Sequence, residues 1–451
     1  MKTTLIAGFL GFAAILFAAE PALAAVSAQE AARLGKDLTP IGAEKAGNKD
    51  GTIPEWTPGE QDGDLSGEYP HNDDIDGEKP TFTITKANMA KYADKLTEGH
   101  KELLGRYDDY KMNVYPSYRF VAFPDEIYEA TQKNATTAEL VAPDRPQGAT
   151  LGFPFPIPKS GAEPIWNHKL KWRGEGVRRY NNQMIVRPNQ PMQLTKLIED
   201  VQFAYASIEN PVELEDGTPY LYYLSETVAP PRLAGQYILV HDKTGTGNEG
   251  RSAWLYNPGF RRIRRAPAVC CDNPYEGTEG YQFYDQVDMF NGILDYYDWK
   301  LLGKKEMYIP YNDNKVASDK VTYKDIATPN HVNQDLPRYE LHRVWVVEAN
   351  NKPGLRHKIK KRVFYIDEDS WNIVAVDNYD QRDELWQFQE GHLTVASNVQ
   401  SAGTVPEVIY HFDSGVYFVT AAFNEDEPYN FDVDFSKNHF SASSVQKNSS
   451  K

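Results

Sequence analysis

The stretch Arg251-Ser-Ala-Trp-Leu-Tyr-Asn-Pro-Gly-Phe-Arg-Arg-Ile-Arg-Arg265 guides the interpretation of the whole chain. Two short arms flank Asn257-Pro258-Gly259, and Pro followed by Gly suits a type II turn. The stretch therefore predicts an antiparallel β-hairpin with aromatic residues on one arm and four arginines on the other.

Short strands separated by turn residues continue this pattern through most of the chain. Strict alternation from residue 339 to residue 347 places Tyr339, Trp345 and Val347 on one face of a strand. Turn signals recur at residues 367–370 and 413–415. This spacing favours an antiparallel meander over βαβ units. We expect strands at residues 170–173, 183–187, 203–208, 220–226, 236–241, 253–256, 339–348, 362–367, 372–378, 384–390, 408–412 and 416–423.

Composition limits the classes of function. The chain has 451 residues and a formal net charge of -16, so binding to a nucleic-acid backbone is excluded over most of the surface. Aromatic residues make up 12% of the chain, which favours β structure and ring-lined cavities.

The N-terminus has the pattern of a cleaved export signal. Lys2 precedes an apolar run over residues 5–19, and Ala22-Leu23-Ala24 fits the small-x-small cleavage rule. We therefore expect a signal peptide over residues 1–24. The mature chain is expected in the periplasm of a Gram-negative bacterium, either soluble or peripheral to the outer membrane.

Three further regions follow the predicted signal peptide. Residues 25–80 are expected to form a short helix and an acidic extended arm, since ten acidic residues and one lysine lie between residues 50 and 79. Ile53 and Trp56 are candidates for anchoring this arm. Residues 81–440 are expected to form a single domain, and residues 441–451 a disordered tail.

Candidates for chemistry are few. No metalloprotease, nucleophile-elbow or Cys-x-x-Cys motif occurs, and acids such as Asp285 and Asp288 are interpreted as turn and strand-end residues. We therefore expect no enzyme, no cofactor and no metal site. Cys270 and Cys271 are adjacent. They are either two buried small hydrophobic residues, the simpler interpretation, or a strained ring that serves as a redox or ligand-sensing device.

The hairpin arginines are unusual in so acidic a chain. Alternation places Arg262 and Arg264 on one face and Arg261 and Arg265 on the other, with Ile263. They either pair with acids of the same chain or contact an anionic ligand head or a partner.

Several segments together resemble a known family, the periplasmic domain of unknown function 1329, often labelled outer-membrane lipoprotein-sorting-like. They span nearly the whole mature chain: residues 48–56, 152–158, 165–168, 253–267, 288–292, 297–300, 339–345 and 364–371. The resemblance implies a mainly β (α+β) fold similar to lipoprotein and lipid carriers. In such a fold a large curved antiparallel sheet forms an unclosed half-barrel, and helices cover its mouth. It also suggests a resistance-nodulation-division type exporter and an outer-membrane protein as partners.

These observations predict a carrier that binds a hydrophobic or lipid-like molecule and passes it between an inner-membrane exporter and the outer membrane. The alternative is a periplasmic adaptor that binds no ligand and docks on an export or outer-membrane complex. The side chains expected to contact the ligand are Phe155, Ile157, Trp166, Trp254, Tyr256, Trp299, Trp345, Arg262 and Arg264.

Overall fold

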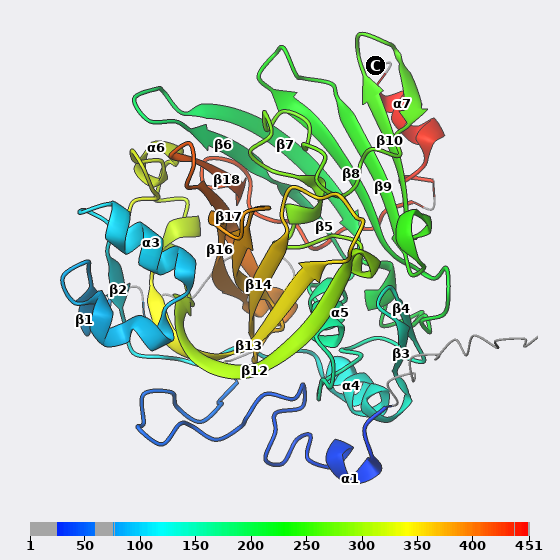
Figure 1. Ribbon diagram of the computed structural model, residues 1–451. Helices are drawn as coiled ribbons and strands as arrows, with labels where there is room; N and C mark the ends of the chain where they lie inside the picture. The colour runs from blue at the N-terminus through cyan, green and yellow to red at the C-terminus, as the bar shows by residue number, and fades with distance from the viewer. Residues whose placement is uncertain (1–24, 59–74, 76, 437, 450–451) are drawn as a thin grey trace, which may run out of the picture.

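A large sheet forms the body of the protein (Figure 1). The computed structural model describes residues 25–58, 75, 77–436 and 438–449, so the predicted signal peptide lies outside the described residues. The sheet has 16 strands, and β3 (Glu139–Ala142) and β4 (Arg145–Gln147) form a separate pair. The 16 strands are β1 (Phe82–Ile84), β2 (Met112–Val114), β5 (Gly176–Tyr180), β6 (Asn182–Val186), β7 (Gln193–Gln202), β8 (Pro219–Ala229), β9 (Tyr237–Lys243), β10 (Arg251–Asn257), β11 (Arg262–Arg265), β12 (Tyr297–Pro310), β13 (Tyr339–Asn351), β14 (Lys361–Asp367), β15 (Ile373–Tyr379), β16 (Leu385–Ala396), β17 (Ser401–His411) and β18 (Val416–Ala422).

The strand order confirms the predicted meander. Two runs of consecutive neighbours, β13 to β18 and β6 to β11, are joined where β18 pairs with β6. β12 and β2 pair with β13, and β5 pairs with β7. Among the described residues β11 pairs with neither β1 nor β12, so the sheet curves without closing into a barrel.

Few helices accompany the sheet in the part of the chain that the structure describes. They are α1 (Ala28–Ala31), α3 (Glu98–Arg106), α4 (Asp125–Thr137), α5 (Ala162–Lys169), α6 (Tyr323–Ile326) and α7 (Ala442–Asn448). α3 packs so closely on β16 that a Cβ at Gly99 would lie 2.1 Å from the ring of Phe388. α5 lies between two distant parts of the sheet. Its N-terminal Gly161 meets the backbone of Lys300 in β12, and Lys169 at its other end lies over the Tyr220 ring in β8.

The described part of the N-terminal arm lies along the body, at the bottom of Figure 1. Ile53 is buried, and the indole N–H of Trp56 donates to the carbonyl of Val121 at 3.0 Å. The Asn48 side chain accepts from the backbone N–H groups of Thr52 and Ile53 and so closes a tight polar turn. The two predicted anchors therefore hold the described part of the arm in place.

Three local expectations are corrected by the structure. Residues 170–173 contain no strand, because the chain leaves α5 there. Residues 203–208 contain the 3-10 turn Ala204–Ala206 instead of a strand. The hairpin of β10 and β11 forms as expected, but the positive φ in its turn belongs to Arg261 (51°) and not to Gly259, so the turn is not type II.

The C-terminal tail also differs from the sequence prediction. A helix, α7, stands where disorder was expected from residue 441 onward. Ser441 caps α7, and its Val445 side chain is buried against Leu239 and Tyr256 on one face of β9 and β10. The cap at Ser441, the buried Val445 and the hydrogen bonds of Gln446 with the Ile263 N–H and the Arg261 carbonyl together hold this polar segment on the sheet.

Candidate functional site: a groove inside the curved sheet

Three hollows follow one another along the inner face of the sheet, with empty volumes of ≈ 780, ≈ 740 and ≈ 930 Å³. The first and second hollows share Phe203, Tyr223 and Val287 in their walls. The second and third share Lys169 and Tyr220. The three hollows therefore adjoin one another, and we call them together the groove.

Strand register determines which side chains face the groove. β9 and β10 pair so that Ala253 lies opposite Val240 and Arg251 opposite Asp242. All four of these side chains line the groove. Because side chains alternate along a strand, Trp254 points to the other face, where it packs with α7.

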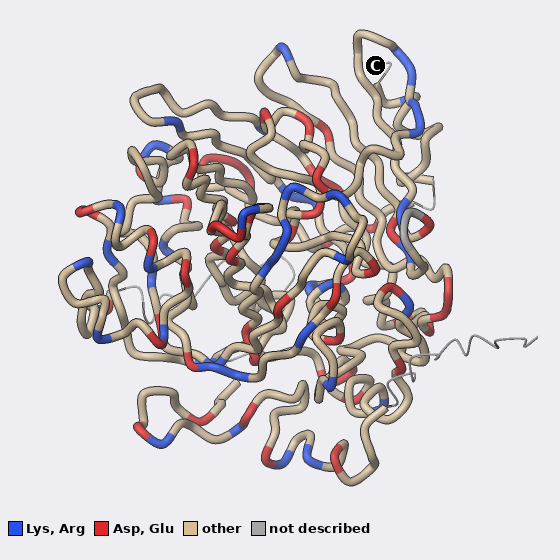
Figure 2. Tube along the Cα trace, in the orientation of Figure 1, with Lys and Arg blue, Asp and Glu red and all other residues tan. Residues whose placement is uncertain are grey.

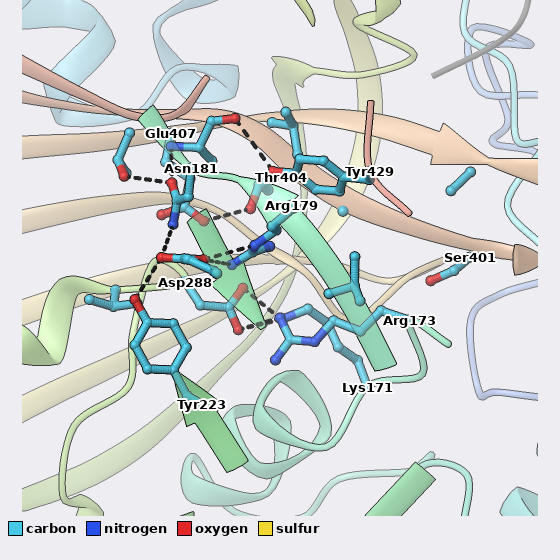
Figure 3. Close-up of a pocket in the computed structure, with 18 of the residues that line it drawn as sticks. Lys171, Arg173, Arg179, Asn181, Tyr223, Asp288, Ser401, Thr404, Glu407 and Tyr429 are labelled. Carbon is cyan, nitrogen blue, oxygen red and sulfur yellow. Dashed lines mark hydrogen bonds and ion pairs between the residues drawn. The ribbon is translucent and has the colours of Figure 1, made fainter. Parts of the chain in front are cut away.

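The first hollow combines an apolar wall with buried charge (Figure 3). Its apolar residues come from β5, from the loop that follows β7, from β17 and from the segment after β18: Val177, Phe203, Val405, Tyr429 and Phe431. Most ligand pockets are lined in this way, with apolar walls and a few placed polar groups. The hollow therefore suits a molecule that is mostly apolar.

Asp288 is the centre of the charged groups in the first hollow. Arg173 donates to its carboxylate at 2.7 Å, and the Lys171 ammonium lies 3.0 and 3.2 Å from its two oxygens. Asp288 and Met289 both have positive φ, 53° and 61°. His168 Nε2 donates to the Asp288 carbonyl at 2.7 Å while its Nδ1 accepts from the Ile373 N–H, which fixes the tautomer of the ring.

A second ion pair lies nearby. Arg179 in β5 donates to Glu199 in β7 at 2.9 Å. The other oxygen of Glu199 accepts from the Asn181 amide and the Tyr223 hydroxyl, both at 2.6 Å. The carboxylate is therefore satisfied from three sides, as a buried charge requires.

Two further groups in the first hollow have shifted protonation equilibria. Burial, together with repulsion from Asp288, raises the pKa of Glu407 to about 7. Burial, together with the nearby Arg173, lowers the pKa of Lys171 to about 7. Despite burial, the cations Arg173 and Lys171 hold the pKa of Asp288 far below its ordinary value. Asp288 is therefore the permanent anion of the hollow, and Glu407 titrates near neutral pH.

The third hollow lies between the end of α5 and the segment after β11. The Lys169 side chain lies over the rings of Trp166 and Tyr220, at 5.0 and 5.7 Å from their centroids. Cys270 and Cys271 line the same hollow and form a disulfide with each other. Neither cysteine is fully buried, so the interpretation as two buried small hydrophobic residues is wrong.

One of the residues predicted to contact a ligand, Trp166, lines the groove. Phe155 and Ile157 line a small hollow beside α1, and Ile157 packs there against Leu34 and Leu38. Trp299 packs against Phe290 and Phe364. Trp345 stacks on the buried Trp371 at a centroid distance of 6.3 Å. The structure thus does not bring the nine residues into one site.

Of the remaining four, Trp254 packs with α7, and Tyr256, Arg262 and Arg264 border a separate hollow at the hairpin, of ≈ 820 Å³. Figure 2 shows basic residues along this hairpin, at the upper right of the view. Phe260 at its tip is 63% exposed, and the Arg264 guanidinium lies 4.6 Å from the Phe260 ring centroid. Within the described part of the chain, none of the four hairpin arginines has an acidic partner within 4.0 Å. The intramolecular pairing considered for them is therefore not found among these residues.

One group of described residues has the composition of a metal site. Ligand-type atoms of His342, Asp367 and Asp369 lie within 4.8 Å of one another. Arg119, however, donates to both oxygens of Asp369 at 2.7 Å, and His342 Nε2 lies 2.9 Å from Glu340. Since protein partners already hold two of the three side chains, we assign the group no metal role.

The chain resembles known proteins in sequence and in structure. The sequence profile of the family described as "Protein of unknown function (DUF1329)" matches residues 83–446. The chain belongs to this family. The resemblance found in the sequence is thereby confirmed. A relative from Pseudomonas aeruginosa, "Uncharacterized protein PA3922", is 42% identical over 461 residues and covers 99% of each chain.

Three solved structures with lower sequence identity align with 63% of this chain. A DUF1329 family protein from Desulfovibrio piger has 14% identity and a TM-score of 0.43, over 63% of this chain and 97% of its own. A putative outer membrane lipoprotein-sorting protein domain from Vibrio parahaemolyticus has 15% identity and a TM-score of 0.44, over 63% and 98%. The LolA superfamily protein NE2245 from Nitrosomonas europaea has 9% identity and a TM-score of 0.37, over 63% and 98%.

The described helices are short, and the longest of the α-helices is α4 with 13 residues. Among the described residues, none combines the length and the apolar character that crossing a bilayer would demand.

Proposed function

We propose that this DUF1329 protein is a periplasmic carrier that binds a hydrophobic or lipid-like molecule in the groove. It would pass this molecule between a resistance-nodulation-division type exporter in the inner membrane and a protein of the outer membrane. The observation that carries the proposal is that the three hollows adjoin: the first and second share Phe203 and Val287, and the second and third share Tyr220. A row of adjoining hollows suits an extended molecule better than a compact one.

Burial of the ligand supplies enough free energy for this role. Burying ~300 Å² of apolar ligand surface at ~25 cal/mol per Å² contributes ~7 kcal/mol before entropy costs. Without those costs it would correspond to a dissociation constant of roughly 10 μM. Moderate affinity suits a carrier, because a carrier must release its cargo as well as bind it. Such transport requires no chemical step.

Native mass spectrometry of the protein purified from its own periplasm tests the proposal. The expected result is a co-purifying small molecule that organic solvent extracts and that partitions into the apolar phase. A clean mass of the mature chain, together with no binding of the neutral hydrophobic dye 1-N-phenylnaphthylamine, would contradict the proposal.

A blocking substitution tests the location. Val287 lines both the first and the second hollow and is only partly buried. Val287→Trp should fill their junction and weaken dye binding by about tenfold or more, a loss of about 1.4 kcal/mol. The matched control is Ala90→Trp, because Ala90 is exposed in the 3-10 helix Met89–Lys95, away from the groove. Equal dye binding by both variants would place the ligand elsewhere.

The hairpin favours a second candidate function, the adaptor that docks on an export or outer-membrane complex. Phe260 is exposed, and Arg262 and Arg264 beside it lie on the surface without acidic partners among the described residues. Aromatic and arginine side chains are enriched at the centres of protein interfaces. In the mass measurement, an adaptor would give a stable protein complex and no small molecule.

A further inference from the structure

We infer that the cargo is an anionic amphiphile whose charged head lies in the third hollow, at Lys169, and whose chain extends through the second hollow into the first. This inference rests on the proposed carrier function and adds the class of ligand and its direction in the groove. It does not depend on the exposed hairpin arginines Arg262 and Arg264.

The charges of the third hollow are unbalanced. Its wall contains two acids, Asp144 and Asp242, and four cations: Lys169, Lys243, Arg251 and Arg265. Both acids are already engaged. Arg251 donates to the two oxygens of Asp242 at 2.6 and 2.7 Å. The oxygens of Asp144 accept from the backbone N–H groups of Leu294 and Asp295 at 2.9 and 2.7 Å.

Lys169 is the cation best placed to bind an anion. Its ammonium donates to the Gly292 carbonyl at 3.1 Å, and no acid of the described residues lies within 4.0 Å of it. An ammonium has three donors, so it keeps capacity for another acceptor in the hollow. The rings of Trp166 and Tyr220 hold it in place. A cation in such a site is stabilised when an anion joins it.

The neighbouring hollow fits the rest of such a molecule. Apolar side chains form most of its wall, among them Val201, Leu221, Ile238, Val240 and Val269. The hairpin arginines are less suitable for the head group. Arg262 and Arg264 are exposed to water, so they gain little from a single anion.

Binding of matched amphiphiles tests the inference directly. Dodecanoic acid, dodecyl phosphate and methyl dodecanoate share one chain, and displacement of 1-N-phenylnaphthylamine measures their affinities at pH 8. We expect the acid and the phosphate to bind about tenfold or more tightly than the ester, because a charge-assisted hydrogen bond is stronger than a neutral one. Binding of the phosphate alone would identify a phosphate head, and binding of both a general anionic head.

Substitutions at Lys169 test whether this residue causes the preference for anionic amphiphiles over the ester. Lys169→Met keeps the stem over the rings and should abolish the preference for the anions while the ester still binds. Lys169→Arg should retain the preference. Lys36→Met, at an exposed position of the N-terminal arm, controls for the loss of one positive charge.

The outcomes separate this inference from the carrier proposal. Equal binding of acid, phosphate and ester by the unmodified protein would overturn the anionic head and leave the carrier in place. Loss of the preference in Arg262→Gln/Arg264→Gln, with Lys169→Met unaffected, would move the head to the hairpin and overturn the assignment. Binding of none of the amphiphiles or the dye would contradict the carrier function itself.

Discussion

The two halves of the sheet differ in how they are filled. In β15 to β18 nearly every residue is buried, because side chains and loops cover both faces. In β8 to β10 buried and partly exposed residues are mixed, and the groove lies against one face. One continuous sheet therefore contains a solid half, which supplies stability, and a hollow half, which has room for a guest.

Buried carboxylates on neighbouring strands show the same contrast. Glu390 in β16 accepts from His100 at 2.8 Å and from the Tyr339 hydroxyl at 3.0 Å. Burial acts to raise its pKa, but the hydrogen bond from His100 and the other partners hold the pKa below its ordinary value. Glu407 in β17 faces the groove, where Thr404 and the Met289 N–H are its donors, and its pKa is raised. The packed interior therefore keeps its carboxylate charged, and the groove, which reaches Glu407 in β17, favours the protonated form.

The largest effect on stability is expected at Trp371 in the solid half. Trp371 is fully buried and donates its indole N–H to the Ile41 carbonyl at 3.1 Å. Trp371→Ala should lower the free energy of unfolding by about 3–5 kcal/mol through cavity formation. Val287→Ala in the hollow half should cost less than about 1.5 kcal/mol, since the removed atoms border empty space. Denaturant unfolding measures both, and equal losses would contradict the division into two halves.

Replacing the two carboxylates, Glu390 and Glu407, by glutamine should change the free energy of unfolding in opposite directions. At pH 7, Glu390→Gln should destabilise by about 3 kcal/mol, because it breaks a buried hydrogen-bonded network. Since the folded pKa of Glu390 is depressed, this loss should shrink as the pH falls below the ordinary value of 4.5. The folded pKa of Glu407 is raised, so its favourable term is complete below pH 4.5 and is lost as the pH rises toward about 7.

Glu407→Gln mimics the protonated form of that residue and should remove this pH dependence. At pH 8 the variant should be more stable than the unmodified protein by about 1–3 kcal/mol. Near pH 4.5 the two proteins should be alike. Unfolding curves recorded between pH 4.5 and pH 8 for both glutamine variants test the pair. A loss of stability at pH 8 in Glu407→Gln would mean that the groove carboxylate is held in its charged form.

Much of the sheet could be predicted from the sequence because alternation and turn residues are local signals. The hairpin of β10 and β11 and the strands from β13 to β18 belong to this part. β7 was missed, since its sequence Gln-Leu-Thr-Lys-Leu-Ile-Glu-Asp-Val-Gln has charges where a strand pattern usually has apolar residues. Residues of other strands pair with those charges, as Arg179 pairs with Glu199. The sequence of a single strand cannot show such pairing.

The groove could be predicted only in outline. Trp254 and Tyr256 were expected to face a ligand, but α7 covers their face, and that helix was itself expected to be disordered. Asp288 was interpreted as a turn acid, although it is the anion that Lys171 and Arg173 share. These contacts join residues more than 100 positions apart, so no local pattern shows them. The sequence signal that could have indicated these charged contacts was the pair of lysines in Lys169-Leu-Lys171.

The smallest effect on stability is expected at Arg262 and Arg264 of the hairpin, whose side chains lie neither in the solid half nor in the groove. Arg262→Gln/Arg264→Gln should change the free energy of unfolding by less than about 0.5 kcal/mol, because both side chains are exposed and have no acidic partner among the described residues. Lys36→Gln/Lys324→Gln removes the same charge at two other exposed positions. Dye binding should be equal in both double variants, since the groove lies on other residues. If dye binding falls in the arginine variant alone, the ligand site extends from the hollow half onto the hairpin, and Arg262 and Arg264 contact the ligand.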